Sequence, residues 1–216
     1  MNGLSNMLLK SQKKPFLIIT AMPFETRAIL SQQSSIIIQN DKNLKLYKLI
    51  DIGYLLEVGV GVKTTNESIL SIINSVEPKI TINVGLCGAL NSNIPIGSQF
   101  LINEIYQFEK GTVPRRTTRP SSLNSFPYKS ILTSREPILN EISRTMMYNK
   151  SACDLVDMES FIIAQLCNHK NIPIIILKVV SDHANEKSAE QINKNKSKLK
   201  LVLSSSLKQI VKDLIH

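Results

Sequence analysis

The chain has 216 residues and a formal net charge of +9, and 43% of its residues are hydrophobic. This length suits one domain with a full hydrophobic core, and the composition is that of an ordinary globular protein. No apolar run reaches the roughly 18 residues that a membrane-spanning helix needs, and the apolar residues near the N-terminus are too interrupted for a signal peptide. We therefore expect a cytoplasmic protein without a membrane span, with a flexible segment at residues 1–14 and one domain at residues 15–216.

The positive charge raises the question of nucleic-acid binding. The lysines are spread along the chain, aromatic residues make up only 5%, and no DNA- or RNA-binding motif is present, so we do not expect a nucleic-acid partner. The three cysteines and three histidines lack the spacing of metal ligands. We expect no metal and no cofactor, and we interpret Cys87, Cys153 and Cys167 as buried free thiols.

The first half of the chain predicts a series of strands and two helices. Apolar, β-branched runs indicate strands at residues 15–20, 35–39, 44–51, 54–58 and 79–84. Helical spacing indicates one helix at residues 24–30, with Pro23 in its first turn, and a second helix after Thr65. The second helix follows Gly59-Val60-Gly61, which is either a tight turn or a place where backbone N–H groups meet an anion or polar ligand.

The second half continues this alternation after a long irregular segment. Residues 109–125 are rich in Pro, Ser, Thr and Arg and lack periodicity, which is typical of a lid or a disordered loop. The remaining patterns predict strands at residues 98–105, 128–133, 154–157 and 172–180, and helices at residues 137–147 and 158–170. We interpret the charged stretch at residues 185–198 as a solvated connection to a C-terminal amphipathic helix that contains Leu203 and Leu207.

Strands that alternate with helices predict an α/β fold. We expect a single domain, a three-layer α/β/α sandwich with a central mixed β-sheet. The strand at residues 172–180 is the most hydrophobic, and we expect it near the centre of the sheet. Open α/β sheets bind ligands in the crevice beyond the ends of their strands. Polar side chains at strand ends are therefore the candidates for a site.

Three carboxylates stand where the backbone pattern changes. Glu159 lies where a strand-like run turns into a helix, Asp182 lies where a strand runs out, and Glu25 follows the first strand. The position of Glu25 alone fits two interpretations equally: a charge that stabilises a helix N-terminus, or a catalytic group. We regard all three carboxylates as candidates for one site.

Short motifs occur in a fixed order between residues 16 and 183. They are Ala21-Met22-Pro23-Phe24-Glu25, Gly59-Val60-Gly61, Ile82-Asn83-Val84-Gly85-Leu86-Cys87-Gly88-Ala89, Val156-Asp157-Met158-Glu159-Ser160 and Ser181-Asp182. In this order and spacing the chain resembles the nucleoside phosphorylase and nucleosidase superfamily, especially the methylthioadenosine/S-adenosylhomocysteine nucleosidases.

The resemblance implies an enzyme that cleaves the N-glycosidic bond of a purine nucleoside, most simply by hydrolysis of a 5′-substituted adenosine. Asp182 matches the family's general acid, which protonates purine N7 and needs a raised pKa near neutral pH. Glu159 matches the residue that binds the ribose 2′- and 3′-hydroxyls, and Glu25 matches the glutamate that activates the attacking water. The other implied substrate-binding residues are Met22, Gly85, Leu86, Ile138, Met158 and Ser181.

The sequence also departs from the family, and the departures define the alternatives. Where related phosphorylases hold phosphate with an arginine and a serine, this chain has Asn83 and Leu86, which argues for water as the nucleophile. Residues 133–138 look more like the phosphorylase-like branch of hopanoid biosynthesis, which acts on an adenosyl-hydrocarbon; Arg27 could then contact phosphate. A purine nucleoside phosphorylase and a degenerate nucleoside-binding protein are further alternatives. The resemblance implies a homodimer in which a neighbour's loop, with residues 109–125 as the candidate, covers the 5′ side of the substrate.

Overall fold

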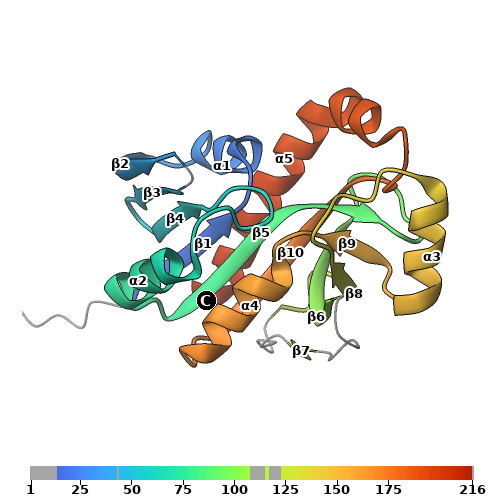
Figure 1. Cartoon of the computed structure of the whole chain (residues 1–216). Coiled ribbons are helices and arrows are strands. Elements are labelled where there is room, and N and C mark those ends of the chain that lie inside the picture. Colours follow the sequence, from blue (N-terminus) through green and yellow to red (C-terminus); the bar gives the residue numbers. More distant parts are fainter. Residues whose placement is uncertain (1–13, 43, 108–114, 117–122, 216) are drawn as a thin grey trace, which may run out of the picture.

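The computed structural model describes residues 14–42, 44–107, 115–116 and 123–215, which form the ribbon in Figure 1. The predicted flexible segment at residues 1–14 lies outside the described residues except for Lys14. Most of the irregular segment at residues 109–125 lies outside them as well. Among the helices of the described residues, none has the length and apolar character that crossing a membrane requires.

Within the described residues the strands form one 10-stranded mixed sheet. In chain order they are β1 (Phe16–Thr20), β2 (Ser35–Asp41), β3 (Leu44–Leu49), β4 (Gly53–Glu57), β5 (Ile80–Ala89), β6 (Gln99–Gln107), β7 (Arg115–Arg116), β8 (Tyr128–Thr133), β9 (Leu155–Asp157) and β10 (Ile174–Asp182). The helices are α1 (Pro23–Leu30), α2 (Asn66–Val76), α3 (Glu141–Ser151), α4 (Ser160–His169) and α5 (Ser188–Ile215). The predicted alternation of strands and helices is therefore confirmed.

Strand β5 joins the two parts of the sheet. It lies parallel to β1 and β10, and its last residues, Gly88 and Ala89, pair antiparallel with β9. Because β10 also pairs with β6, β6 with β8 and β8 with β9, these strands close into a ring. The predicted strand ended at residue 84, which is too early, since Gly85 and Gly88 stay in the strand and make room for neighbouring side chains. Strand β10 lies between β5 and β6, as its hydrophobicity predicted.

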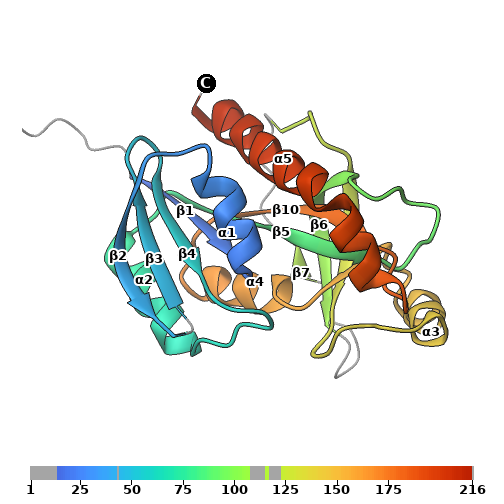
Figure 2. The same ribbon diagram turned by 90° about the horizontal axis from the view of Figure 1, so that it is seen from above.

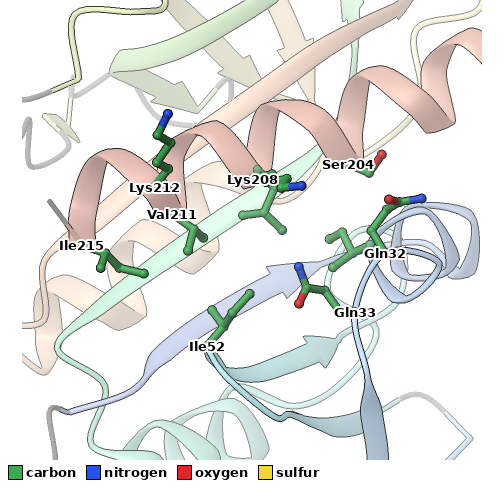
Figure 3. Close-up of a pocket in the computed structure, with 10 residues that line it drawn as sticks. Gln32, Gln33, Ile52, Ser204, Lys208, Val211, Lys212 and Ile215 are labelled. Atoms are coloured by element: carbon green, nitrogen blue, oxygen red, sulfur yellow. The ribbon is translucent and has the colours of Figure 1, made fainter.

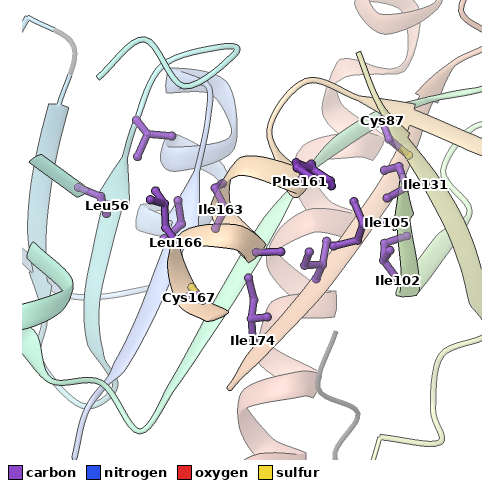
Figure 4. Packing of buried hydrophobic residues seen from close by; sticks show 14 of the residues in the cluster. Leu56, Cys87, Ile102, Ile105, Ile131, Phe161, Ile163, Leu166, Cys167 and Ile174 are labelled. Atoms are coloured by element: carbon purple, nitrogen blue, oxygen red, sulfur yellow. The ribbon is translucent and has the colours of Figure 1, made fainter. Parts of the chain in front are cut away.

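Helices cover both faces of the sheet (Figures 1 and 2). Helices α1 and α5 pack on one face, where Ile29 and Leu207 belong to a buried apolar cluster. Helices α2 and α4 pack on the other face, and Figure 4 shows Phe161 of α4 near Ile105 of β6 and Ile131 of β8. These three layers are the predicted α/β/α sandwich. The three cysteines are buried and free, as expected.

Two helix boundaries differ from the prediction. Helix α3 begins at Glu141 rather than near residue 137, because the Asn140 side chain caps it by accepting a hydrogen bond from the Ser143 N–H at 2.8 Å. The solvated connection expected at residues 185–198 is wrong, because α5 already begins at Ser188. Buried Leu199 continues the apolar face of this helix toward its N-terminus, while the lysines between these residues face solvent.

Candidate active site

The carboxyl ends of the parallel strands β1, β5 and β10 meet at one edge of the sheet. A cavity of about 230 Å³ opens there, and the β9–α4 junction and the residues before α3 complete its wall. Glu25, Glu159 and Asp182 all line this cavity. The structure therefore brings together three carboxylates that are far apart in the sequence. The cavity wall also includes the predicted binding residues Met22, Leu86, Ile138, Met158 and Ser181.

Glu25 lies in the first turn of α1 and is only 2% exposed. Its Oε2 accepts hydrogen bonds from the backbone N–H groups of Ala21 and Met22, both at 2.9 Å, and its Oε1 accepts one from Leu86 at 2.7 Å. The first two bonds satisfy N–H groups at the helix N-terminus, and the third ties the carboxylate to β5. Burial raises the pKa of Glu25, and the backbone donors and nearby Lys178 oppose this rise. Glu25 therefore caps the helix N-terminus and also lines the cavity.

Glu159 immediately precedes α4 and is buried. Its Oε1 accepts a hydrogen bond from the Gly61 N–H at 2.8 Å, and its Oε2 lies 3.4 Å from the Met158 N–H. Gly61 has a φ of 68°, a left-handed conformation that favours glycine. The glycine turn thus presents an N–H to a carboxylate of this chain. Burial, and next the neighbouring Asp157, raise the pKa of Glu159 to about 7.

Asp182 is the last residue of β10, and hydrogen-bond donors surround its carboxylate. Its Oδ1 accepts from the Ala184 N–H at 2.8 Å and from the Ser188 hydroxyl at 2.6 Å. Its Oδ2 accepts from the Ser181 hydroxyl at 2.6 Å. These contacts fix the carboxylate in one orientation at the cavity wall.

A buried ion pair lies next to these carboxylates. Lys178 Nζ is 2.8 Å from Asp157 Oδ2, and each side chain is 1% exposed. Burial by itself lowers the pKa of Lys178, but Asp157 and then Glu159 outweigh burial and raise it to about 12. Asp157 also accepts hydrogen bonds from the hydroxyls of Thr133 and Ser160. The pair is therefore held by β8, β9, α4 and β10 together.

Gly85 is the predicted site residue that is not part of the cavity wall. A Cβ at this position would lie 2.9 Å from Oε1 of Glu25 and 3.4 Å from Nζ of Lys178. The first distance is too short for a real Cβ contact. Glycine at this position therefore leaves the space into which Glu25 and Lys178 project.

Parts of this chain are similar to known proteins. Residues 131–215 match the family model described as the phosphorylase superfamily. A 5′-methylthioadenosine/S-adenosylhomocysteine nucleosidase of Buchnera aphidicola subsp. Schizaphis graminum is 25% identical, in an alignment that covers 90% of this chain and 95% of that protein. The C-terminal part of this chain is thus similar to the phosphorylase superfamily.

Solved structures share the fold of this chain. A 5′-methylthioadenosine/S-adenosyl homocysteine nucleosidase of Helicobacter pylori superposes with a TM-score of 0.82 at 16% identity, covering 93% of this chain and 99% of that one. A futalosine hydrolase of the same organism has a TM-score of 0.80 at 16% identity, covering 93% and 98%. These likenesses confirm the predicted α/β fold with a central mixed sheet.

At the two positions where related phosphorylases hold phosphate, the residues of this chain make hydrogen bonds within the protein. The Asn83 amide donates to the Ile19 carbonyl at 3.1 Å and does not line the cavity. The Leu86 side chain is part of the cavity wall, and its N–H holds Glu25. Arg27 is exposed on α1 and is not among the described residues of the cavity wall. Among those residues, none is lysine, arginine or histidine.

Two parts of this environment were not predicted from the sequence. Lys178 sits inside the most hydrophobic strand, and a single lysine in such a run gives no indication of its partner. Ser188 was assigned to a solvated connection, but its hydroxyl bonds Asp182. The sequence does contain a signal, because Asp157 stands close before Glu159 and a second carboxylate was therefore to be expected in the site. Two neighbouring buried carboxylates require a buried cation as their partner.

A second cavity, of about 200 Å³, lies between α1 and α5 (Figure 3). Its wall includes Gln32, Gln33, Lys208 and Lys212 above apolar side chains such as Val211. Among the described residues that line it, none carries a carboxyl, imidazole or thiol group. This second cavity therefore lacks the carboxylates that line the first. Within the described residues, no three histidine, cysteine or acidic side chains are grouped so as to hold a metal.

Proposed function

We propose that this protein hydrolyses the N-glycosidic bond of a 5′-substituted adenosine and releases adenine. The observation that carries the proposal is the convergence of three buried carboxylates, Glu25, Glu159 and Asp182, on one cavity. The relatives named 5′-methylthioadenosine/S-adenosylhomocysteine nucleosidase support the substrate class. Cleavage requires a proton for the leaving base, stabilisation of a cationic sugar and a nucleophile, and each carboxylate supplies one of these.

Asp182 is proposed as the acid that protonates the purine. Its Oδ1 already accepts from Ala184 and Ser188, so the proton destined for the base is carried on Oδ2. The Ser181 hydroxyl lies 2.6 Å from Oδ2 and 3.1 Å from the Cys87 carbonyl oxygen, and it orients this side of the carboxyl group. A positioned general acid of this kind contributes roughly 10²–10⁴ in rate.

Glu159 is proposed as the group that binds the ribose hydroxyls. Gly61 occupies Oε1, which leaves Oε2 for the substrate because its contact with Met158 is long at 3.4 Å. An ionised carboxylate beside the ring also opposes the positive charge that develops on the sugar. Met158, which lines the cavity, is proposed to pack on the sugar.

Glu25 is proposed as the base that activates water. A carboxylate offers about four lone-pair sites, and the backbone donors of Ala21, Met22 and Leu86 occupy three of them. One site remains for a water molecule, and the raised pKa of the buried carboxyl group makes it a better base. The absence of cationic side chains among the described residues of the cavity wall supports water over phosphate as the nucleophile.

The test is product analysis with purified protein. We expect adenine from methylthioadenosine or adenosylhomocysteine at equal rates with and without phosphate, together with the free sugar. A sugar 1-phosphate formed in phosphate buffer would make the enzyme a phosphorylase, as the hopanoid-type and purine nucleoside phosphorylase alternatives require. Calorimetric binding of these nucleosides without any turnover would favour a nucleoside-binding protein.

The partner of this protein is proposed to be a small nucleoside rather than a nucleic acid. The cytoplasmic location and the homodimer remain predictions, and the segment expected to reach a neighbour, residues 109–125, lies mostly outside the described residues. Sedimentation analysis of the purified chain tests the dimer. A monomer at concentrations that support full activity would contradict it.

A further inference from the structure

Three buried carboxyl groups beside the cavity share a single buried ammonium group. Glu25 of α1, Asp157 of β9 and Glu159 before α4 surround one ammonium group, that of Lys178 on β10. These side chains are all nine-tenths or more buried. If all three carboxyl groups were ionised, two buried negative charges would lack a cation, which is costly.

The ammonium is fixed at a particular place within this group. Asp157 holds it at 2.8 Å, and Asp157 is itself held by the hydroxyls of Thr133 and Ser160. The space beside Gly85 lets Lys178 Nζ and Oε1 of Glu25 approach the same point of β5. The lysine is not part of the cavity wall, so it acts on the substrate only through its neighbours.

We propose that Lys178 and Asp157 form a pair of positioning residues that sets the charge state of Glu159 and Glu25. The inference rests on the proposed function for its catalytic consequence, but the pair itself is defined by the contacts above. The cation favours ionised carboxylates, and the Asp157 anion opposes them. The charged groups that act most strongly on Glu159 are Asp157, Lys178 and Glu25. Asp182 lines the same cavity, while the Cys87 thiol of β5 stays neutral because burial raises its pKa.

The two members of the pair have opposite effects, and this gives a sharp test. In Lys178→Met the cation is lost, so Glu159 should ionise at a pH higher by about one unit. In Asp157→Asn an anion is lost while the cation remains, so Glu159 should ionise at a lower pH. In the double variant both charges are absent, and the midpoint should return close to the wild-type value. Lys178→Arg keeps the cation and should restore most of the wild-type behaviour.

The measurement is a pH titration of protein labelled with ¹³C at the glutamate carboxyl carbons, with the Glu159 signal assigned by its loss in Glu159→Gln. Opposite shifts in the two single variants support the proposal. Unchanged midpoints, or midpoint shifts in the same direction in both single variants, overturn it. A purely structural role would give no reason for the two substitutions to shift the midpoint in opposite directions. If Lys178→Met does not fold, the comparison of Asp157→Asn with the neutral double variant measures the same effect of the lysine charge.

The pH profile of adenine release provides the catalytic readout. Its acidic limb should move in the same directions as the titration midpoints. The proposed function fails separately if the wild-type protein releases no adenine at any pH while the carboxyl titrations still shift. The inference fails, and the function stands, if adenine is released and both the limb and the midpoints are unmoved by the two single substitutions.

Discussion

The Gly85→Ala variant should lose catalytic rate without losing the fold. The added Cβ would lie 2.9 Å from Oε1 of Glu25 and 3.3 Å from its carboxyl carbon, so the carboxylate must move away from β5. That movement breaks the 2.7 Å hydrogen bond from the Leu86 N–H. A hydrogen bond to a charged group contributes about 1.5–3 kcal/mol, and 1.36 kcal/mol is tenfold in rate, so kcat should fall roughly 10–100-fold.

The assay is adenine release by Gly85→Ala, with the KM and the thermal unfolding curve measured on the same preparation. The matched control is Glu25→Asp, whose shorter side chain retreats from the added methyl group. We expect the double variant to be less impaired than the product of the two single effects predicts. The reasoning would be refuted if Gly85→Ala kept the wild-type kcat, or if the two effects simply multiplied.

Two further predictions concern the neighbouring carboxylates. Glu159 has a pKa of about 7 in the folded protein, against an ordinary value of 4.5. Between these pH values the folded state holds a proton that the unfolded chain releases. The free energy of unfolding that this group contributes is therefore lost as pH rises from 4.5 through 7. In Glu159→Gln the loss between pH 5 and 8 should be smaller by about 2.5 kcal/mol in urea unfolding, and an equal loss in both proteins would contradict this. Ser188→Ala removes the 2.6 Å hydrogen bond to Asp182 and should lower kcat by roughly 10-fold. The control Ser205→Ala, on the exposed side of the same helix, should leave kcat unchanged. Equal rates for both variants would count against the role of Ser188.

Much of the fold and of the candidate site is predictable because parallel strands end at the same edge of a sheet. The turn after β1 and the end of β10 therefore place Glu25 and Asp182 at the same edge, because both strands run parallel to β5. The motif around Glu159 marks a strand-to-helix junction, which places its side chain at the same edge.

The remaining features depend on pairings that local patterns do not encode. The Gly61 N–H meets Glu159, 98 residues away, and its turn alone does not indicate a partner. Lys178 lies in a strand whose apolar neighbours dominate its pattern, although its ammonium meets Asp157. Helix α5 begins at Ser188, and the buried Ser188 and Leu199 lie at helical spacing with the partly buried Ile192 and Asn195 between them. The lysine-rich face made the segment look like a solvated connection.

The most direct test of the central claim compares adenine release from methylthioadenosine by the wild-type protein and by Asp182→Asn under identical conditions. The amide cannot deliver a proton to the purine, so the account predicts that the variant binds the nucleoside but releases adenine roughly 10²–10⁴ times more slowly. Equal rates for the two proteins would contradict the account.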